Sequence, residues 1–153
     1  MRIARLDAFP RFIPHLADRF AVEWPEWAAT VSRGELESGF ACAPEPAKLP
    51  VVLVAFEGDR LLGTIALRHW FGDAPMAETP WVRGLYVVPE ARGKRVGPGL
   101  IEAVGQEAKQ RGYRAMHAAT TRIEGYLVKQ GWEVFRRVDH KGEPMAWLRR
   151  ALA

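Results

Sequence analysis

The residues best suited to chemistry lie in one short glycine-rich and basic segment, RGKRVGPG, at positions 92–99. An apolar run at 85–88 comes directly before it, and a helical pattern begins at Val96. Free amides at the start of a helix, together with the helix dipole, bind anions, and pyrophosphate is a natural ligand. Glycines let the backbone approach such a ligand, and basic side chains add positive charge. The segment therefore predicts a pyrophosphate site.

Two common phosphate-binding motifs do not describe this segment. A P-loop requires G-x-x-x-x-G-K-[S/T], and the sequence contains no such string. The dinucleotide fingerprint begins in the same way as Gly97-Pro98-Gly99, but Glu102 stands where its third glycine belongs. The pattern indicates a phosphate site of another kind.

The segment resembles the pyrophosphate loop of the GNAT superfamily of N-acyltransferases, whose pattern is Arg/Gln-x-x-Gly-x-Gly/Ala. Arg92 matches the first position of that pattern and Gly97 matches the last. Two residues depart from the usual loop, since Arg95 replaces a glycine and Pro98 lacks an amide that could bind phosphate. The resemblance covers roughly residues 51–150.

The resemblance implies a site for acetyl-coenzyme A (acetyl-CoA), with no metal ion. The loop amides would hold the pyrophosphate, and the pantetheine arm would pair with the backbone of residues 86–88. The amide of Val87 or Val88 would stabilise the oxyanion that develops on the thioester carbonyl. The implied coenzyme-binding residues are Tyr86, Val87, Val88, Arg92, Gly93, Lys94, Arg95, Val96, Gly97 and Gly99.

Direct attack by a neutral amine requires a proton acceptor, and the departing thiolate requires a proton donor. Some relatives place a glutamate near the start of the fourth strand, but Trp81 stands there, which leaves Glu78 and His69 as candidate bases. The family's usual donor is a tyrosine whose position is taken by Leu127, with Tyr126 one residue early. We expect Tyr126, Glu78 and His69 to be catalytic, while a core position for Tyr126 stays open.

The resemblance also implies that the first helices and the loop before the fourth strand shape the acceptor site. Acids and tryptophans there suit a cationic amine. Amphipathic helices also bury tryptophans for structure alone, which is the simpler interpretation of Trp27. Protein N-termini, lysines, polyamines, amino acids and aminoglycosides all stay open as acceptors. The residues in question are Glu23, Trp24, Glu26, Trp27, Asp73 and Glu78.

The rest of the sequence predicts the elements that position these residues. Strands are expected at 2–6, 51–56, 60–69, 81–88, 114–119, 132–138 and 145–148, and helices at 10–23, 26–38, 96–111 and 123–130. This order predicts a mixed α/β (α+β) fold with a largely antiparallel sheet. The resemblance implies a twisted sheet of about seven strands, flanked by about four helices, whose fourth and fifth strands splay apart.

Length and composition place these elements in one domain over residues 1–153, which can bury a sizeable core and which the resemblance implies is N-acetyltransferase-like. No apolar run reaches the ~18 residues of a membrane helix, and the start does not resemble a signal peptide. Cys42 is the only cysteine, so no internal disulfide forms, and we expect a cytoplasmic protein. One cysteine and four scattered histidines give no metal-ligand spacing.

The net charge of +4 makes nucleic acid a partner to consider. Basic residues mostly alternate with acids, however, and no basic helix face carries interleaved aromatic residues, so we expect neither nucleic acid nor membrane partners. The resemblance implies a transferase that acetylates a small-molecule or peptide amine, and relatives that are often homodimers. The alternative is a GNAT-like module that senses acyl-CoA without catalysis, which the missing tyrosine and glutamate favour slightly.

Overall fold

The computed structural model describes residues 1–72 and 74–153, and its strands form one seven-stranded sheet in the order β1-β2-β3-β4-β5-β7-β6. All neighbouring strands are antiparallel except β4 and β5, which confirms the predicted mixed fold. The strands are β1 (Arg2–Arg5), β2 (Val51–Glu57), β3 (Arg60–Arg68), β4 (Trp81–Val87), β5 (Ala115–Thr120), β6 (Glu133–His140) and β7 (Glu143–Ala151). The helices are α1 (Ile13–Glu23), α2 (Pro25–Ala28), α3 (Arg33–Ser38), α4 (Val96–Gln110) and α5 (Glu124–Lys129).

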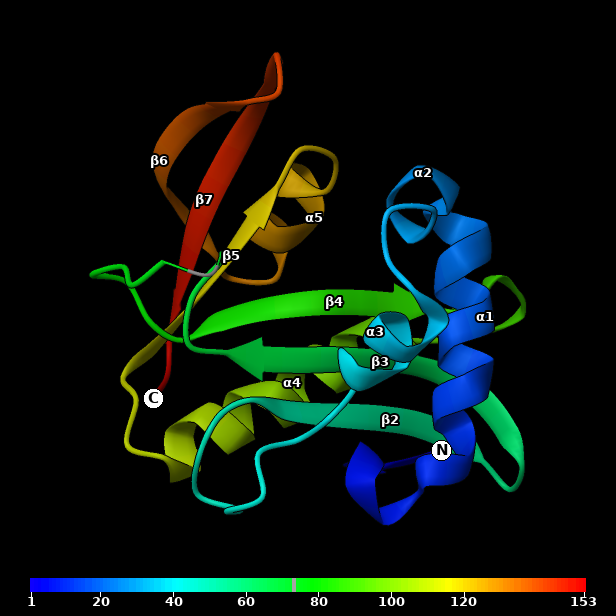
Figure 1. Ribbon diagram of the computed structural model, residues 1–153. Coiled ribbons are helices and arrows are strands. Elements are labelled where there is room, and N and C mark those ends of the chain that lie inside the picture. The colour runs from blue at the N-terminus through cyan, green and yellow to red at the C-terminus, as the bar shows by residue number, and fades with distance from the viewer. Residues whose placement is uncertain (73) are drawn as a thin grey trace.

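Two layers of helix enclose the first half of the sheet. Figure 1 shows α1 and α3 in front of strands β2 to β4 and α4 behind them, with α2 at the end of α1 beyond β4. Phe20 of α1 holds the front layer in place, because its ring centroid lies 4.9 Å from that of Phe40 and 5.4 Å from that of Tyr86. The apolar face of α4, including Leu100 and Val104, is completely buried on the other side. Strands β2 and β3 are covered on both faces, which explains their nearly continuous apolar runs.

Strands β4 and β5 diverge along most of their length. They run parallel and pair at one position, Trp81 opposite His117, after which the two strands separate (Figure 1). The imidazole of His117 packs on the Trp81 ring, 5.5 Å between centroids, and its Nδ1 lies 3.0 Å from the Pro80 carbonyl oxygen. The splay implied by the resemblance is therefore present, and buried aromatic contacts hold its base together.

Strand β4 contains a bulge near its middle. Thr64 of β3 pairs with Tyr86 while Ala66 pairs with Arg83, so β4 has one extra residue between these two pairs. Gly84 lies in this interval with a φ of 65°, a left-handed conformation that glycine adopts without steric cost. The extra residue leaves a stretch of β4 without regular pairing to β3.

The front helices differ from the prediction. The single helix expected at residues 26–38 is wrong, because the segment forms two short helices, α2 and α3. Ser32 begins α3 with a capping box: its hydroxyl accepts from the Glu35 amide, and the Glu35 carboxylate accepts from the Ser32 amide. The helix expected from residue 10 also starts later, because Pro10–Phe12 forms a 3-10 turn before α1.

The final hairpin is confirmed. Lys141 and Gly142 connect β6 and β7 with positive φ angles of 52° and 84°, the geometry that two-residue hairpin loops favour. Within residues 1–72 and 74–153, no helix is long and apolar enough to cross a membrane.

Candidate active site

The glycine-rich loop turns sharply from β4 into α4. Gly93 and Arg95 both have left-handed φ angles, 78° and 65°, and α4 begins at the next residue, Val96. The backbone amides of Gly93, Lys94, Arg95, Val96 and Gly97 make no hydrogen bond to any group in the described part of the chain. A row of free amides at the start of a 15-residue helix is an anion site.

Arg95 explains why related loops carry glycine at its position. Its φ of 65° and ψ of 20° place it in the left-handed region, which costs a residue with a Cβ about 1–2 kcal/mol relative to the right-handed one. Arg95 thus adopts the left-handed backbone conformation that glycine usually provides at this position. The departure from the family pattern therefore adds a positive charge to the loop while the turn is retained.

The Arg92 side chain contacts other groups of the protein. Its Nε donates to the Val87 carbonyl over 2.9 Å, its guanidinium lies 3.8 Å from the Glu23 carboxylate, and it sits over the Tyr86 ring. The Val87 carbonyl thus faces away from β3. In an antiparallel strand the amide of a residue points to the same side as its own carbonyl. The Val87 amide consequently faces the open side of β4, towards the splay.

A cavity of about 560 Å³, the loop cavity, lies against this turn. Seven of the ten predicted coenzyme-binding residues line it: Tyr86, Val87, Arg92, Gly93, Arg95, Val96 and Gly97. Lys94 is exposed beside it. Val88 and Gly99 lie elsewhere. The Val88 amide donates to the Leu62 carbonyl over 2.9 Å. The Gly99 amide donates to the Arg95 carbonyl, and Gly99 itself faces Met1. Of the two amides proposed for the oxyanion, that of Val87 faces away from β3, whereas that of Val88 is bonded to β3.

A second cavity, about 490 Å³, occupies the gap between β4 and β5, and we call it the splay cavity. Leu85 and Trp24 line both it and the loop cavity, so the two adjoin. Leu127, at the position of the family tyrosine, lines the splay cavity. Tyr126 instead lines the loop cavity.

Tyr126 therefore lies at the phosphate end of the site. Its hydroxyl is 3.6 Å from the point where a Cβ on Gly97 would stand. Burial raises the pKa of the Tyr126 phenol, and the nearby positive charge of Arg95 opposes that shift. A raised pKa keeps the hydroxyl protonated, so Tyr126 can act as a hydrogen-bond donor. Its role as proton donor to the thiolate stays a prediction, and it is not a core residue, because 36% of its surface is exposed.

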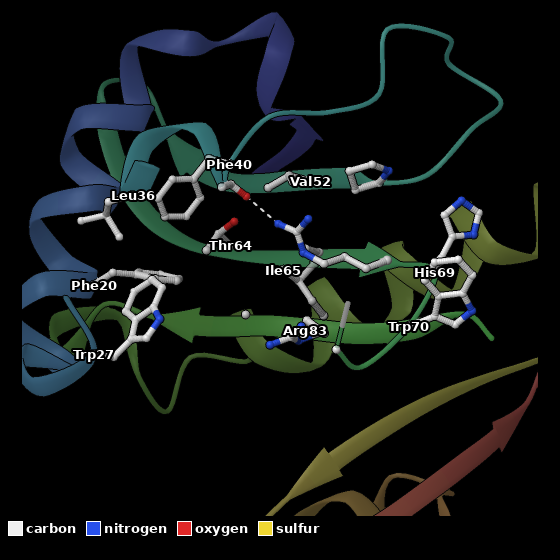
Figure 2. A pocket seen from close by; sticks show the side chains of 16 residues that line it. Phe20, Trp27, Leu36, Phe40, Val52, Thr64, Ile65, His69, Trp70 and Arg83 are labelled. Atoms are coloured by element: carbon white, nitrogen blue, oxygen red, sulfur yellow. Dashed lines mark hydrogen bonds between the residues drawn. The ribbon is translucent and has the colours of Figure 1, made fainter. Parts of the chain in front are cut away.

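A third cavity, about 540 Å³, lies on the front face of the sheet beneath α1 to α3, and we call it the helix-face cavity. Phe20, Trp27, Leu36 and Phe40 gather at one end of it, and His69 and Trp70 at the other (Figure 2). Arg83 and Gly84 line both this cavity and the splay cavity. The two cavities thus meet at the bulge of β4.

The two candidate bases are separated by the fold. His69 lines the helix-face cavity at its solvent-exposed end. Glu78 lines none of the three cavities, and its carboxylate lies 3.3 Å from the Arg136 guanidinium of β6, while its carbonyl accepts from the Trp81 indole. Glu78 thus joins the loop before β4 to the last hairpin.

The other predicted acceptor residues are also divided. Trp27, still 48% exposed, lines the helix-face cavity, whereas Glu23 and Trp24 line the loop cavity. Glu26 lines none of these cavities, and Asp73 lies outside the described residues. In the described part of the chain, no group of three or more His, Cys, Asp or Glu side chains could hold a metal ion.

Sequence reasoning missed Gly84 and Arg68. A glycine inside an apolar strand pattern is a known sign of a bulge, so Gly84 could have been found. Arg68, at the end of β3, lines the helix-face cavity and donates to the Gly39 carbonyl. No local pattern shows which face of the sheet an arginine at a strand end will occupy.

Comparison with known proteins agrees with this geometry. Residues 13–126 match the family model described as "Acetyltransferase (GNAT) family". The chain belongs to the GNAT acetyltransferase family. It is therefore an acyltransferase that uses acetyl-CoA as its acetyl donor. A search of curated protein sequences gives no match.

Solved GNAT structures share the complete fold. An aminoglycoside 6'-N-acetyltransferase complexed with coenzyme A has a TM-score of 0.79 at 18% identity, over 100% of this chain and 98% of its own. The aminoglycoside 6'-N-acetyltransferase from Enterococcus faecium gives 0.78 at 17% identity, with the same coverage. The protein yncA from Salmonella typhimurium, with its cofactor acetyl-CoA, gives 0.77 at 19% identity over 100% and 94%. At these identities the likeness establishes the fold alone.

Proposed function

We propose that this GNAT protein transfers an acetyl group from acetyl-CoA to a primary amine by direct attack within a ternary complex. One observation carries the proposal: the splay cavity and the helix-face cavity meet at Arg83 and Gly84. A coenzyme in the splay and an amine beneath the front helices would reach the same point of β4 from two sides. Such a meeting point removes the need for an enzyme nucleophile, because the two reactants are held next to each other.

The coenzyme half of the site fits acetyl-CoA. Free amides from Gly93 to Gly97 suit the pyrophosphate, and the adjoining loop and splay cavities give the pantetheine arm a path along β4. The Val87 amide, which faces away from β3, is our candidate for stabilising negative charge on the thioester oxygen. A single such donor is worth about 3 kcal/mol in other acyl-transfer sites.

The reaction must move two protons. As the amine nitrogen bonds to the acetyl carbon, the carbon–sulfur bond breaks, the nitrogen loses a proton, and the thiolate gains one. His69 is the better of the two candidate bases, since it lines the helix-face cavity while Glu78 is paired with Arg136, and we propose that it accepts the proton through water. Tyr126 is the donor that the sequence predicted, but its position beside Gly97 favours phosphate binding, and we propose that water in the cleft protonates the thiolate. We propose that residues 1–153 form one domain that performs this chemistry. We also propose that Lys94 binds the coenzyme together with the loop amides.

The proposal is tested first by binding. Calorimetry should detect acetyl-CoA, and 3'-dephospho-CoA should bind nearly as well, because the loop offers its free amides to pyrophosphate. A ligand of the native state must also raise the melting temperature. No heat and no melting shift with either compound would overturn the coenzyme assignment.

Turnover is tested next. A panel of primary amines, including kanamycin, spermidine, amino acids and a lysine peptide, is incubated with acetyl-CoA, and free thiol is measured. The enzyme should release thiol at a rate that depends on the concentration of at least one amine. Coenzyme binding without amine-dependent release would favour the sensor module, in which Leu127 replaces the family tyrosine.

A further inference from the structure

The helix-face cavity carries positive charge where a site for a cationic amine needs negative charge. Two arginines, Arg68 and Arg83, line it together with His69. Among the described residues that line the cavity there is no aspartate and no glutamate. Two of the acids expected at the acceptor site lie elsewhere, with Glu23 beside Arg92 and Glu78 beside Arg136.

Arg68 is the most informative of these side chains. Its guanidinium donates to the Gly39 carbonyl, a neutral partner, and it makes no ion pair with any described residue. Burial lowers the pKa of the Arg68 guanidinium, so its charge is poorly solvated. A partly desolvated guanidinium with most of its five donors unused is suited to a planar anion that two parallel hydrogen bonds can hold.

The remaining wall of the cavity is apolar and aromatic. Phe20, Leu36 and Phe40 are each less than 10% exposed, and Trp27 and Trp70 extend the apolar surface towards solvent (Figure 2). The volume of about 540 Å³ lies in the range that small-molecule sites occupy. The cavity thus offers a cationic point and an apolar wall to one small ligand.

From these features, and resting on the proposed function, we infer that the acceptor is an amine that also bears a carboxylate and an apolar side chain, and that Arg68 binds the carboxylate. The amine of such a molecule can lie towards Gly84, which lines both this cavity and the splay, while its side chain packs on the aromatic wall. An aminoglycoside carries several positive charges, which the Arg68 guanidinium would repel. The inference therefore separates this enzyme from the aminoglycoside acetyltransferases that share its fold.

The experiment compares pairs of amines that differ only in the carboxylate: phenylalanine with phenethylamine, leucine with isoamylamine, and tryptophan with tryptamine. Kanamycin is the polycationic comparison. Binding to the coenzyme-saturated protein is measured by calorimetry, and acetyl transfer by thiol release. We expect the carboxylate to improve both the Kd and kcat/KM at least about tenfold, the value of one charged hydrogen bond. Equal or better kcat/KM for a decarboxylated amine or for kanamycin would overturn the inference and leave the proposed function standing.

Variants assign the effect to Arg68. Arg68→Gln should reduce the preference for the carboxylate at least about tenfold, through KM more than kcat, and Arg68→Lys should restore part of it. Arg60→Gln is the matched control, because Arg60 is exposed at the opposite end of β3 and lines none of the three cavities. An unchanged preference in Arg68→Gln would contradict the assignment. The wild-type comparison keeps the inference testable if that variant is unstable.

The binding measurement also separates the inference from the proposed function. Binding of an amino acid that depends on Arg68 but leads to no acetylation would support the site and reject the reaction. Absence of binding and of turnover for every carboxylated amine, with transfer to a decarboxylated one, would reject the site and support the reaction. Failure of all amines to bind rejects the site outright.

Discussion

The coenzyme side of the site consists mainly of backbone groups from one segment, whereas the acceptor side consists of side chains from several elements. On the coenzyme side, one continuous segment from Tyr86 to Gly97 provides the free amides, the left-handed turn and the start of α4. On the acceptor side, side chains from α1, α2, α3, β3 and β4 converge on the helix-face cavity. The first half depends on backbone conformation, which a local pattern can encode. The second depends on which residues meet in space, which a local pattern does not encode.

The coenzyme side and the acceptor side also differ in how their arginines are paired. The coenzyme side has a helix start, and its arginine Arg92 is bonded to Val87 and Glu23. On the acceptor side, the one described partner of Arg68 is a carbonyl. Under our proposal, the chain retains the family's phosphate site while its acceptor site presents a positive charge. The coenzyme should therefore respond most to backbone substitutions, and the acceptor to side-chain substitutions such as Arg68→Gln.

The largest effect should come from Gly97→Val. A Cβ at Gly97 meets only ordinary contacts at 3.6 and 3.9 Å, so the folded protein has room for a methyl group there. A branched side chain would occupy the space over the free amides and exclude the phosphate. We expect roughly 100-fold weaker binding of acetyl-CoA by calorimetry, because about two charged hydrogen bonds are lost.

Gly34→Val is the matched control for this variant. Gly34 also lies in a helix and has open space beside it, but it lines none of the three cavities. Both variants should melt within a few degrees of the wild type, and Gly97→Ala should fall between wild type and Gly97→Val in affinity. Normal coenzyme binding by Gly97→Val with a lowered melting temperature would mean that Gly97 is structural.

Much of the fold could be predicted because its elements carry periodic signals. All seven strands lie where apolar runs indicated them, and α4 begins at Val96 as expected. The error at residues 26–38 arose because Ser32 and Glu35 form a capping box that begins a new helix inside this segment. A strong helix start in mid-segment splits the helix, and apolar spacing alone does not detect it.

The sequence could predict less about the site, and the reason is spatial. The loop residues are neighbours in sequence, and seven of the ten line one cavity. Glu78 and His69 are close in the chain, yet the fold directs Glu78 to Arg136 of β6 and leaves His69 at the helix-face cavity. The partner that captures Glu78 is 58 residues away, and no local rule reaches that far.

A smaller effect is expected from Tyr126→Phe. Because Tyr126 lies beside Gly97 and not beside Leu127 in the splay, its hydroxyl is placed to bond the phosphates. We expect about tenfold weaker coenzyme binding, the value of one hydrogen bond to a charged group, with an unchanged single-turnover rate at saturation. The opposite result, normal affinity with a rate at least about tenfold lower, would establish Tyr126 as the proton donor.

Tyr113→Phe serves as the control for the loss of a phenol. Tyr113 lies between α4 and β5 and lines none of the three cavities. Its removal should change neither affinity nor rate. If both variants lower affinity equally, the effect of Tyr126→Phe comes from stability and not from the coenzyme site.

The smallest effect, and the one that best separates backbone from charge in the loop, should come from Arg95→Gly. Glycine removes the left-handed strain of about 1–2 kcal/mol but adds about 0.5–1 kcal/mol of unfolded-state entropy. The free energy of unfolding should therefore rise by roughly 0.5 kcal/mol in chemical denaturation. Coenzyme affinity should fall about threefold, since an exposed charge is worth at most about 1 kcal/mol. Lys141→Gly, at a φ of 52° in the last hairpin, should match the gain in stability without the loss of affinity. Unchanged affinity in Arg95→Gly would show that the coenzyme site depends on the backbone turn alone, in contrast to the acceptor site, which we propose depends on the charge of Arg68.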